Sequence, residues 1–195
     1  HRISPSYSFG GKIGINLNNN HEITLDFMAT KFRQDFLHNE LDSTTMTFPI
    51  YQSSLSYNSF DYMILYRHNK DGRYMEIGPS IQKIRKVNFN DEFPQPSIFT
   101  LEDVNKIQTN INLGFGAYFI GSENFGITTG FRISYTLSDL ISSNGQLDCF
   151  PTQKNYNEYQ PSHPLFICFL MEANFDFAYF AKAKCTSRTK LILFK

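Results

Sequence analysis

The chain of 195 residues contains no tryptophan and no uninterrupted apolar run near the ~18 residues that a membrane-spanning helix needs. The second absence excludes a bundle of membrane helices within this sequence. If these residues cross a membrane, they must do so as a closed β-barrel, because only strands paired all the way round satisfy every backbone polar group in lipid.

Charged residues are also scarce, at 18% of the chain, and 18 Lys and Arg balance 18 Asp and Glu. The net charge of +0 gives no reason to expect nucleic acid or another polyanion as a partner. Aromatic residues are abundant instead, with 20 Phe and 11 Tyr. Both types favour strands, and Tyr also suits the boundary between water and lipid.

Cysteine is rare, and its three copies are Cys149, Cys168 and Cys185. An odd and scattered set without CxxC spacing is unsuited to a disulfide framework or a cysteine metal site. We therefore expect three unpaired structural cysteines.

Interruptions of two kinds alternate along the chain. Short polar ones fall at 18–20, 69–72 and 121–124, and long irregular ones fall at 37–52, 88–107 and 138–163. An up-and-down barrel produces this rhythm when its tight turns lie at one end and its long loops at the other, as in transmembrane barrels.

Between the interruptions, apolar and polar residues alternate with period two, which predicts strands. The predicted strands are 6–17, 21–33, 53–68, 73–87, 108–120, 125–137, 164–180 and 187–194. Pro79 lies inside the fourth, and proline in a strand indicates an edge or a bulge. The predicted fold is a single all-β domain over 1–195, an eight-stranded antiparallel up-and-down transmembrane β-barrel.

The two faces of these strands differ in chemistry. One face carries bulky Phe, Ile, Leu and Tyr, whereas the other carries Gly, Ser, Thr and Asn with isolated charges. These charges are Lys12, Asp26, Asp61, Arg67, Glu76, Arg132, Glu172 and Asp176. A soluble lipocalin-like barrel turns its apolar face inward, and a membrane barrel turns it to lipid. Small residues with sparse charges of both signs suit a narrow lumen, so the pattern favours the membrane barrel.

Charges inside such a lumen must pair, because an isolated buried charge costs several kcal/mol. We expect a network centred on Arg132, with Glu76, Asp61, Glu172 and Asp176 as its possible partners. Eight strands enclose room for little more than side chains. The sequence therefore predicts a plugged lumen rather than a conducting pore.

Catalytic and metal-binding patterns are weak. The histidines, His1, His21, His38, His68 and His163, fall at chain ends, turns and long loops, and only His38 and His163 suggest a convergent pair. Ser134 and His163 are the candidates for a triad of the kind a lipid hydrolase or acyltransferase uses, but no Gly-x-Ser-x-Gly motif is present. We expect no enzyme activity, no metal and no cofactor.

Two stretches carry a family resemblance. Residues Tyr74–Ser80 match a pattern Y-x-E-x-G-P, and Gly130–Leu140 is similar to G-x-R-x-x-Y-x-L-T-D/N-I. With the hairpin rhythm, the chain resembles the outer-membrane β-barrels of Bacteroidetes-type bacteria, the PorT-like group. Members usually end in an aromatic residue, whereas here Phe194 is next to last. The resemblance implies no single activity, since members range from structural proteins to components of secretion systems.

The expected location is the outer membrane of a Gram-negative bacterium, with the short turns and 181–187 in the periplasm and the long loops outside. The sequence has no initiator Met and no signal-peptide pattern, so we expect His1 to begin a processed chain.

The expected role is structural or interaction-based, and membership of an outer-membrane secretion or assembly complex is one form that it can take. Outer-membrane lipid and other outer-membrane or periplasmic proteins are the expected partners, and nucleic acid is not. Phe93, Tyr156 and Tyr159 in the long loops are candidate contacts. A membrane-embedded lipid-modifying enzyme and a soluble lipocalin-like binder are the alternatives.

Overall fold

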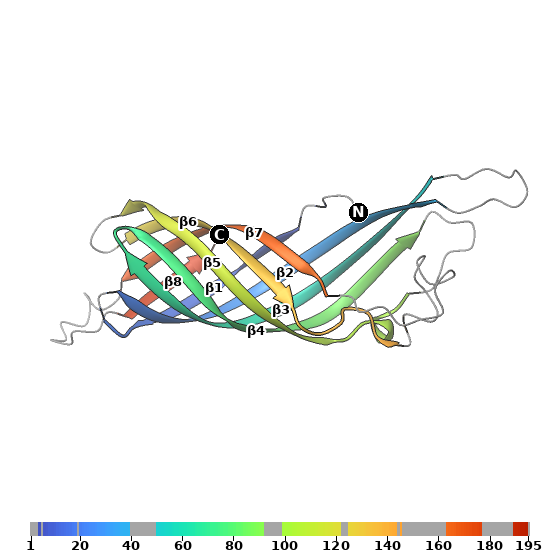
Figure 1. The fold of residues 1–195 in the computed structure, drawn as a ribbon, viewed down its shortest axis with the longest axis horizontal. Helices are drawn as coiled ribbons and strands as arrows, with labels where there is room; N and C mark the ends of the chain where they lie inside the picture. Colours follow the sequence, from blue (N-terminus) through green and yellow to red (C-terminus); the bar gives the residue numbers. More distant parts are fainter. Residues whose placement is uncertain are drawn as a thin grey trace, which may run out of the picture.

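A computed structural model describes residues 4, 6–18, 20–39, 50–91, 99–121, 125–143, 145, 163–176 and 189–194. The protein is built from antiparallel strands that wind obliquely around one long axis (Figure 1). The predicted all-β antiparallel fold is thereby confirmed. No helix among the described residues is long and apolar enough to cross a membrane.

The strands follow one another around the sheet in chain order. Their bounds are β1 Tyr7–Asn16, β2 His21–Asn39, β3 Ile50–Lys70, β4 Arg73–Asp91, β5 Ile107–Gly121, β6 Phe125–Thr136, β7 Leu165–Asp176 and β8 Thr189–Phe194, with the short 3-10 helix η1 Leu101–Asp103 between β4 and β5. Strands β1 to β7 form one curled sheet. The short strand β8 pairs with both β7 and β1 and thereby closes it.

The strands β2, β3 and β4 are longer than the polar spacing predicts. The β2–β3 ladder pairs residues from His21 opposite His68 out to Asn39 opposite Ile50. Three residues at each end of the predicted long loop 37–52, namely 37–39 and 50–52, therefore belong to the strands. In the same way, β4 continues to Asp91 inside the predicted loop 88–107. The strands therefore continue beyond the stretches of alternating apolar and polar residues that predict them.

The tight turn between β3 and β4 is the best-defined hairpin connection. Asp71 and Gly72 both have positive φ angles, 50° and 74°. Positive φ at both central residues is the signature of a type I′ turn, whose twist matches that of the strands it joins, and Asp-Gly is one of its preferred pairs. The predicted turn 69–72 therefore narrows to two residues.

Two irregularities interrupt the ladder between β3 and β4. Pro79 stands in β4 opposite Ile111 of β5, and no paired residues connect 78–79 to β3. Further along, Ser59 lies opposite Ile84 and Asn58 opposite Lys86, so Arg85 is an extra residue on β4. Proline lacks the donor that a ladder needs, and one extra residue defines a β-bulge.

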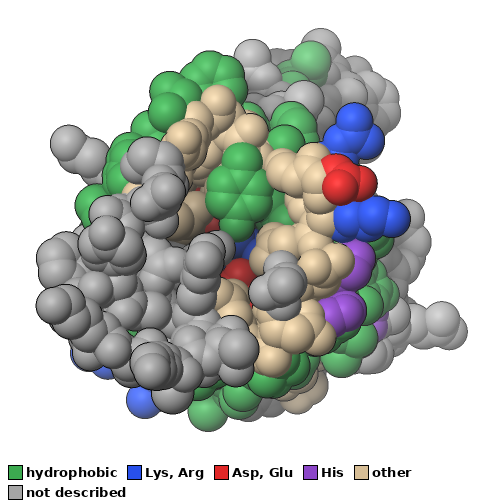
Figure 2. Space-filling view, turned by 90° about the vertical axis from the view of Figure 1, so that its left-hand side faces the viewer, with side chains coloured by type: hydrophobic (Ala, Val, Ile, Leu, Met, Phe, Trp, Pro, Cys, Tyr) green, Lys and Arg blue, Asp and Glu red, His purple; other side chains and the backbone are tan. Residues whose placement is uncertain are grey.

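The barrel wall is turned with its apolar side outward. Side chains such as Ile167 and Phe169 of β7 are 70% and 62% exposed, whereas Lys12 and Arg132 are 0% and 2% exposed. Figure 2 looks onto the short-turn end and shows hydrophobic side chains around the margin and charged ones inside a central hollow. The inward face is therefore the polar one.

Toward the long-loop end, the lumen is filled by apolar side chains that form a second region, here called the apolar cap. Its members are Leu55, Tyr57, Ile84, Phe99, Val104, Leu140 and Ile141. Residues from the connections β4–β5 and β6–β7 fold onto the strands here, and Val104 forms a β-bridge with Ile141. Parts of the predicted loops 88–107 and 138–163 thus belong to the interior.

Candidate functional site

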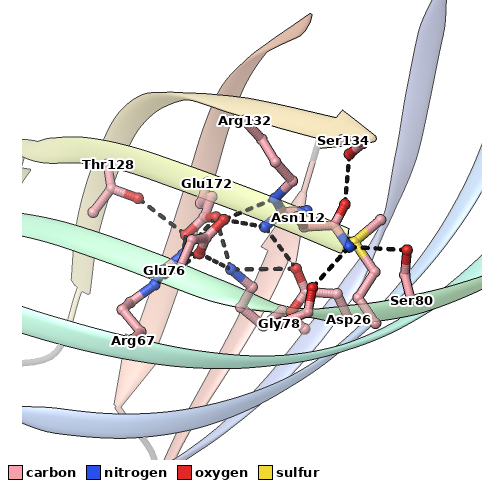
Figure 3. Close-up of polar contacts among 12 residues, drawn as sticks. Asp26, Arg67, Glu76, Gly78, Ser80, Asn112, Thr128, Arg132, Ser134 and Glu172 are labelled. Carbon is pink, nitrogen blue, oxygen red and sulfur yellow. Dashed lines mark hydrogen bonds and ion pairs between the residues drawn. The ribbon is translucent and has the colours of Figure 1, made fainter. Parts of the chain in front are cut away.

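The candidate site is a network of six buried charges in the lumen, contributed by six different strands. Its members are Lys12 of β1, Asp26 of β2, Arg67 of β3, Glu76 of β4, Arg132 of β6 and Glu172 of β7. Figure 3 labels five of them, all but Lys12, and shows their side chains converging between the strands. Three cations face three carboxylates, so these six formal charges cancel.

Arg132 holds two carboxylates from distant parts of the chain. Its Nη2 donates to Oε1 of Glu76 at 2.5 Å and to Oδ2 of Asp26 at 3.0 Å, and its Nε donates to the same Glu76 oxygen at 2.8 Å. The predicted pairing of Arg132 with Glu76 is therefore present. Asp26 was predicted to face the lumen but was not among the partners expected for Arg132.

Arg67 joins the remaining acids into the same network. Its Nη2 donates to Glu76 Oε2 at 2.7 Å and to Glu172 Oε1 at 2.9 Å, and its guanidinium lies over the Tyr74 ring at 4.0 Å. The stacked aromatic face adds a favourable cation–π contact. Each of the two glutamates therefore receives hydrogen bonds from charged donors.

Lys12 lies between all three carboxylates. Its Nζ is 2.8 Å from Glu172 Oε1, 3.4 Å from Asp26 Oδ2 and 3.6 Å from Glu76 Oε2. Such close charge pairing offsets the large cost of removing the ions from water. Losing any one cation would leave at least two carboxylates undercompensated.

Glycines in the wall make room for these side chains. Gly114 of β5 lies between Glu76 on one side and Arg132 on the other in strand register. A Cβ added there would come within 2.6–3.0 Å of the Glu76 side chain. The ring of Tyr74 occupies the corresponding space over Gly116 and Gly130. The glycine–aromatic alternation of the sequence is thus complementary packing inside the barrel.

Asp61 lies apart from the network. Its Oδ2 accepts from Thr30 Oγ1 at 2.5 Å and its Oδ1 from Ser59 Oγ at 2.9 Å, and Ser59 also accepts from Gln82. The expected ion pair with Arg132 is replaced by this hydroxyl site, because Asp61 is further from the turns than Asp26 on the neighbouring strand. Glu172, a further predicted partner of Arg132, binds Arg67 and Lys12 instead.

Asn112 organises a neutral layer beside the charges. Its Nδ2 donates to Ser80 Oγ at 2.9 Å, and its Oδ1 accepts from Ser134 Oγ at 2.5 Å. Ser134, a candidate nucleophile in the sequence, therefore binds an amide. His163 contacts the Thr136 carbonyl oxygen at 3.1 Å through Nδ1, and its Nε2 is 3.9 Å from Asp139.

Two features escaped the sequence reasoning. Glu22 is buried in the lumen, where its Oε2 accepts from Asn69. The alternation in the sequence indicates only that Glu22 lies on the polar face of its strand. His21 and His68 lie opposite each other on β2 and β3, with their Nδ1 atoms 3.4 Å apart. Their pairing depends on strand register, which the spacing of histidines along the chain does not reveal.

Among the described residues, no group of three or more His, Cys, Asp and Glu is placed to hold a metal ion. Cys168 is a free thiol in β7. Several predicted positions lie outside the described side chains. These are Phe93, Tyr156, Tyr159, Asp176, His1, His38, Cys149, Cys185 and the turn 181–187.

Comparison of the chain with protein-family models, curated proteins and solved structures finds no match. The resemblance to the PorT-like barrels therefore stays a prediction. What the geometry itself defines is a barrel-shaped sheet with an ion-paired interior and an apolar exterior.

Proposed function

We propose that this protein is a small eight-stranded barrel of the outer membrane, with a structural or interaction role and a lumen closed by ion pairs. The observation that carries the proposal is the inverted burial pattern. Each strand from β1 to β7 carries exposed Phe, Ile or Leu side chains on its outer face, while the inner face outside the apolar cap carries most of the buried polar and charged side chains. An exposed apolar band of this kind suits lipid, and it would be an aggregation hazard in water.

The alternatives fit this pattern less well. A lipocalin-like binder needs an apolar cavity, whereas here the inward face carries the six paired charges. A lipid-modifying enzyme needs a nucleophile beside a base, whereas Ser134 donates to Asn112. An interaction role at the barrel ends agrees with both observations, and other outer-membrane or periplasmic proteins are the partners we propose.

Membrane insertion is the direct test. The protein refolded into phosphatidylcholine vesicles should resist extraction by alkaline carbonate and should migrate differently on SDS gels before and after boiling. A soluble protein would be recovered in buffer without detergent. That recovery, with native strand content by circular dichroism, would contradict the proposal.

The plugged lumen is tested separately. Planar bilayers containing the inserted protein should show no discrete conductance steps if the ion pairs of Lys12, Arg67 and Arg132 with their carboxylate partners block the lumen as we propose. Regular single-channel steps from the unmodified protein would overturn the plugged-lumen part of the proposal and leave the membrane location standing.

A further inference from the structure

We propose that the outer wall near the long-loop end binds a phosphate-bearing membrane lipid. The headgroup would contact a group of exposed cations, and an acyl chain would lie in an apolar groove next to them. This inference rests on the proposed membrane location. It goes further by naming the class of lipid and the place where it binds.

The β-bulge at Arg85 creates the cationic surface. Ile84 is buried in the apolar cap, while Lys83, Arg85 and Lys86 are all exposed. In a regular strand Lys86 would share the inward face of Ile84. Because the bulge adds one residue, Lys86 lies opposite the outward-facing Asn58 instead. Three cations within four residues therefore project from the same outer face.

Neighbouring strands enlarge this surface. Asn58 is paired with Lys31 of β2 on one side and with Lys86 on the other, so both lysines lie at one level of the wall. Two strand spacings separate them, roughly 10 Å, which long lysine side chains can bridge through a shared anion. Lys106 adjoins β4 as well, because its carbonyl oxygen accepts from the Ile84 amide.

These cations are available for an anion. The ion pairs among the described residues include none of Lys31, Lys83, Arg85, Lys86 and Lys106, although the nearby Arg33 is paired with Asp35 at 2.9 Å. Arg85 stacks its guanidinium over Phe60 at 5.4 Å. That contact holds one cation at the edge of the apolar outer wall nearer the long loops.

An apolar groove begins at the same phenylalanine. Its outward lining includes Phe9, Phe27, Ala29, Phe60 and Tyr62. Ala29 lies between Phe9 and Phe60 in strand register, so its small side chain leaves a gap between two rings. The next outward residue on β2 is Lys31. The groove therefore leads directly to the cationic surface.

An amphiphile with an anionic head matches both features at once. Lys and Arg supply charge-assisted donors to phosphate oxygens, and the ring-lined groove accommodates methylene groups. Basic clusters beside the apolar zone are a recognised sign of anionic-lipid binding. The balanced net charge of the whole chain conceals this local excess of cations.

Native mass spectrometry of the refolded protein in dodecyl maltoside micelles is the test, with phosphatidic acid and phosphatidylcholine as probes. The unmodified protein should retain phosphatidic acid preferentially. The triple variant Lys83→Gln/Arg85→Gln/Lys86→Gln should lose affinity by about fivefold for each charge removed, on the order of 100-fold in all. Lys70→Gln/Arg73→Gln, which removes exposed cations at the opposite end, is the matched control and should bind like the unmodified protein.

Ala29→Leu separates the groove from the charges. Filling the gap should weaken retention of phosphatidic acid while the cations stay in place. Inorganic phosphate at the same concentration should displace little of the lipid, because it cannot occupy the groove. Equal retention of the two lipids, equal loss in the Lys70/Arg73 control, or full displacement by inorganic phosphate would each overturn the inference.

Insertion of each variant into phosphatidylcholine vesicles is measured in parallel. A protein that inserts but shows no lipid preference refutes this inference alone. A protein that does not enter vesicles refutes the proposed membrane location, and the lipid site with it.

Discussion

Near the short turns, the lumen contains the ion pairs of Arg67 and Arg132 with their carboxylates. Near the long loops, it contains the packed apolar side chains of Leu55, Tyr57 and Ile84. Both regions fill the same barrel, yet they place different demands on sequence. Ion pairs require a particular donor at a particular angle, and apolar packing requires mainly volume. The ionic region should therefore tolerate few substitutions, and the apolar cap should tolerate those that conserve volume.

The largest effect is expected from Arg132→Gln in the ionic region. It removes one of the two cations that Asp26 and Glu76 share, the other being Lys12, and breaking a buried pair costs about 4 kcal/mol of unfolding free energy. Urea unfolding in micelles followed by circular dichroism measures this loss, and the bilayer should stay free of conductance steps. Arg33→Gln, at an exposed ion pair, should change stability by less than about 1 kcal/mol. If both variants lost a similarly small unfolding free energy, the buried network would not contribute to stability as we expect.

The matching change in the apolar cap is Leu55→Ala. Leu55 is 1% exposed, and truncation of such a residue costs about 3 kcal/mol through lost burial and the cavity left behind. Leu55→Met conserves volume and should cost less than about 1.5 kcal/mol. If Leu55→Met destabilised as strongly as Leu55→Ala in the same unfolding assay, the contrast between the two regions would disappear.

A smaller effect is expected from Gly114→Ala, which tests the space that the ionic region needs. The added methyl would meet the Glu76 side chain at 2.6–3.0 Å, and overpacking of this kind costs about 2 kcal/mol. Gly11→Ala is the matched control, since nothing lies within 4 Å of a Cβ at Gly11. Equal melting temperatures for the two variants would show that Glu76 can move aside freely.

The smallest effect is expected from Thr100→Ala at the edge of the apolar cap. Thr100 and Asp103 form a capping box on η1, with the Thr100 hydroxyl accepting from the Glu102 amide. Loss of a cap costs about 1 kcal/mol and should act locally. Hydrogen exchange should accelerate at 100–104 while β1 and β2 keep their protection. Faster exchange throughout the barrel would mean that the cap supports the whole fold.

Local patterns were sufficient to predict which residues face the lumen. Lys12, Arg67 and Glu172 all lie inward as the period-two pattern predicts, because side-chain alternation depends only on neighbours along the strand. The choice of partners was predicted less well. Asp26 and Arg132 are 106 residues apart in the chain and meet through the radius of the barrel and the tilt of its strands. Neither the radius nor the tilt can be read from the sequence of one hairpin, because both depend on how all the strands pair.

The inward folding of the long connections was also missed. Val104 and Ile141 lie in segments predicted as loops, because isolated apolar residues among polar ones show no period. One available signal was the Thr100-x-x-Asp103 spacing, which is typical of a capped helical turn. A capped turn followed by an apolar residue would have indicated an ordered segment above the lumen.

The bulge at Arg85 also has a consequence for how this sequence can vary by insertion and deletion. Deleting Arg85 would remove the bulge and leave a regular strand in which Lys86 still faces outward and Val87 still faces inward, so all later residues of β4 would keep their faces. A single deletion elsewhere in the wall would turn the later residues of that strand to the opposite face, because side chains alternate along a strand. Single-residue length differences in related barrels should therefore occur at this bulge, and the rest of the wall should admit length changes only two residues at a time.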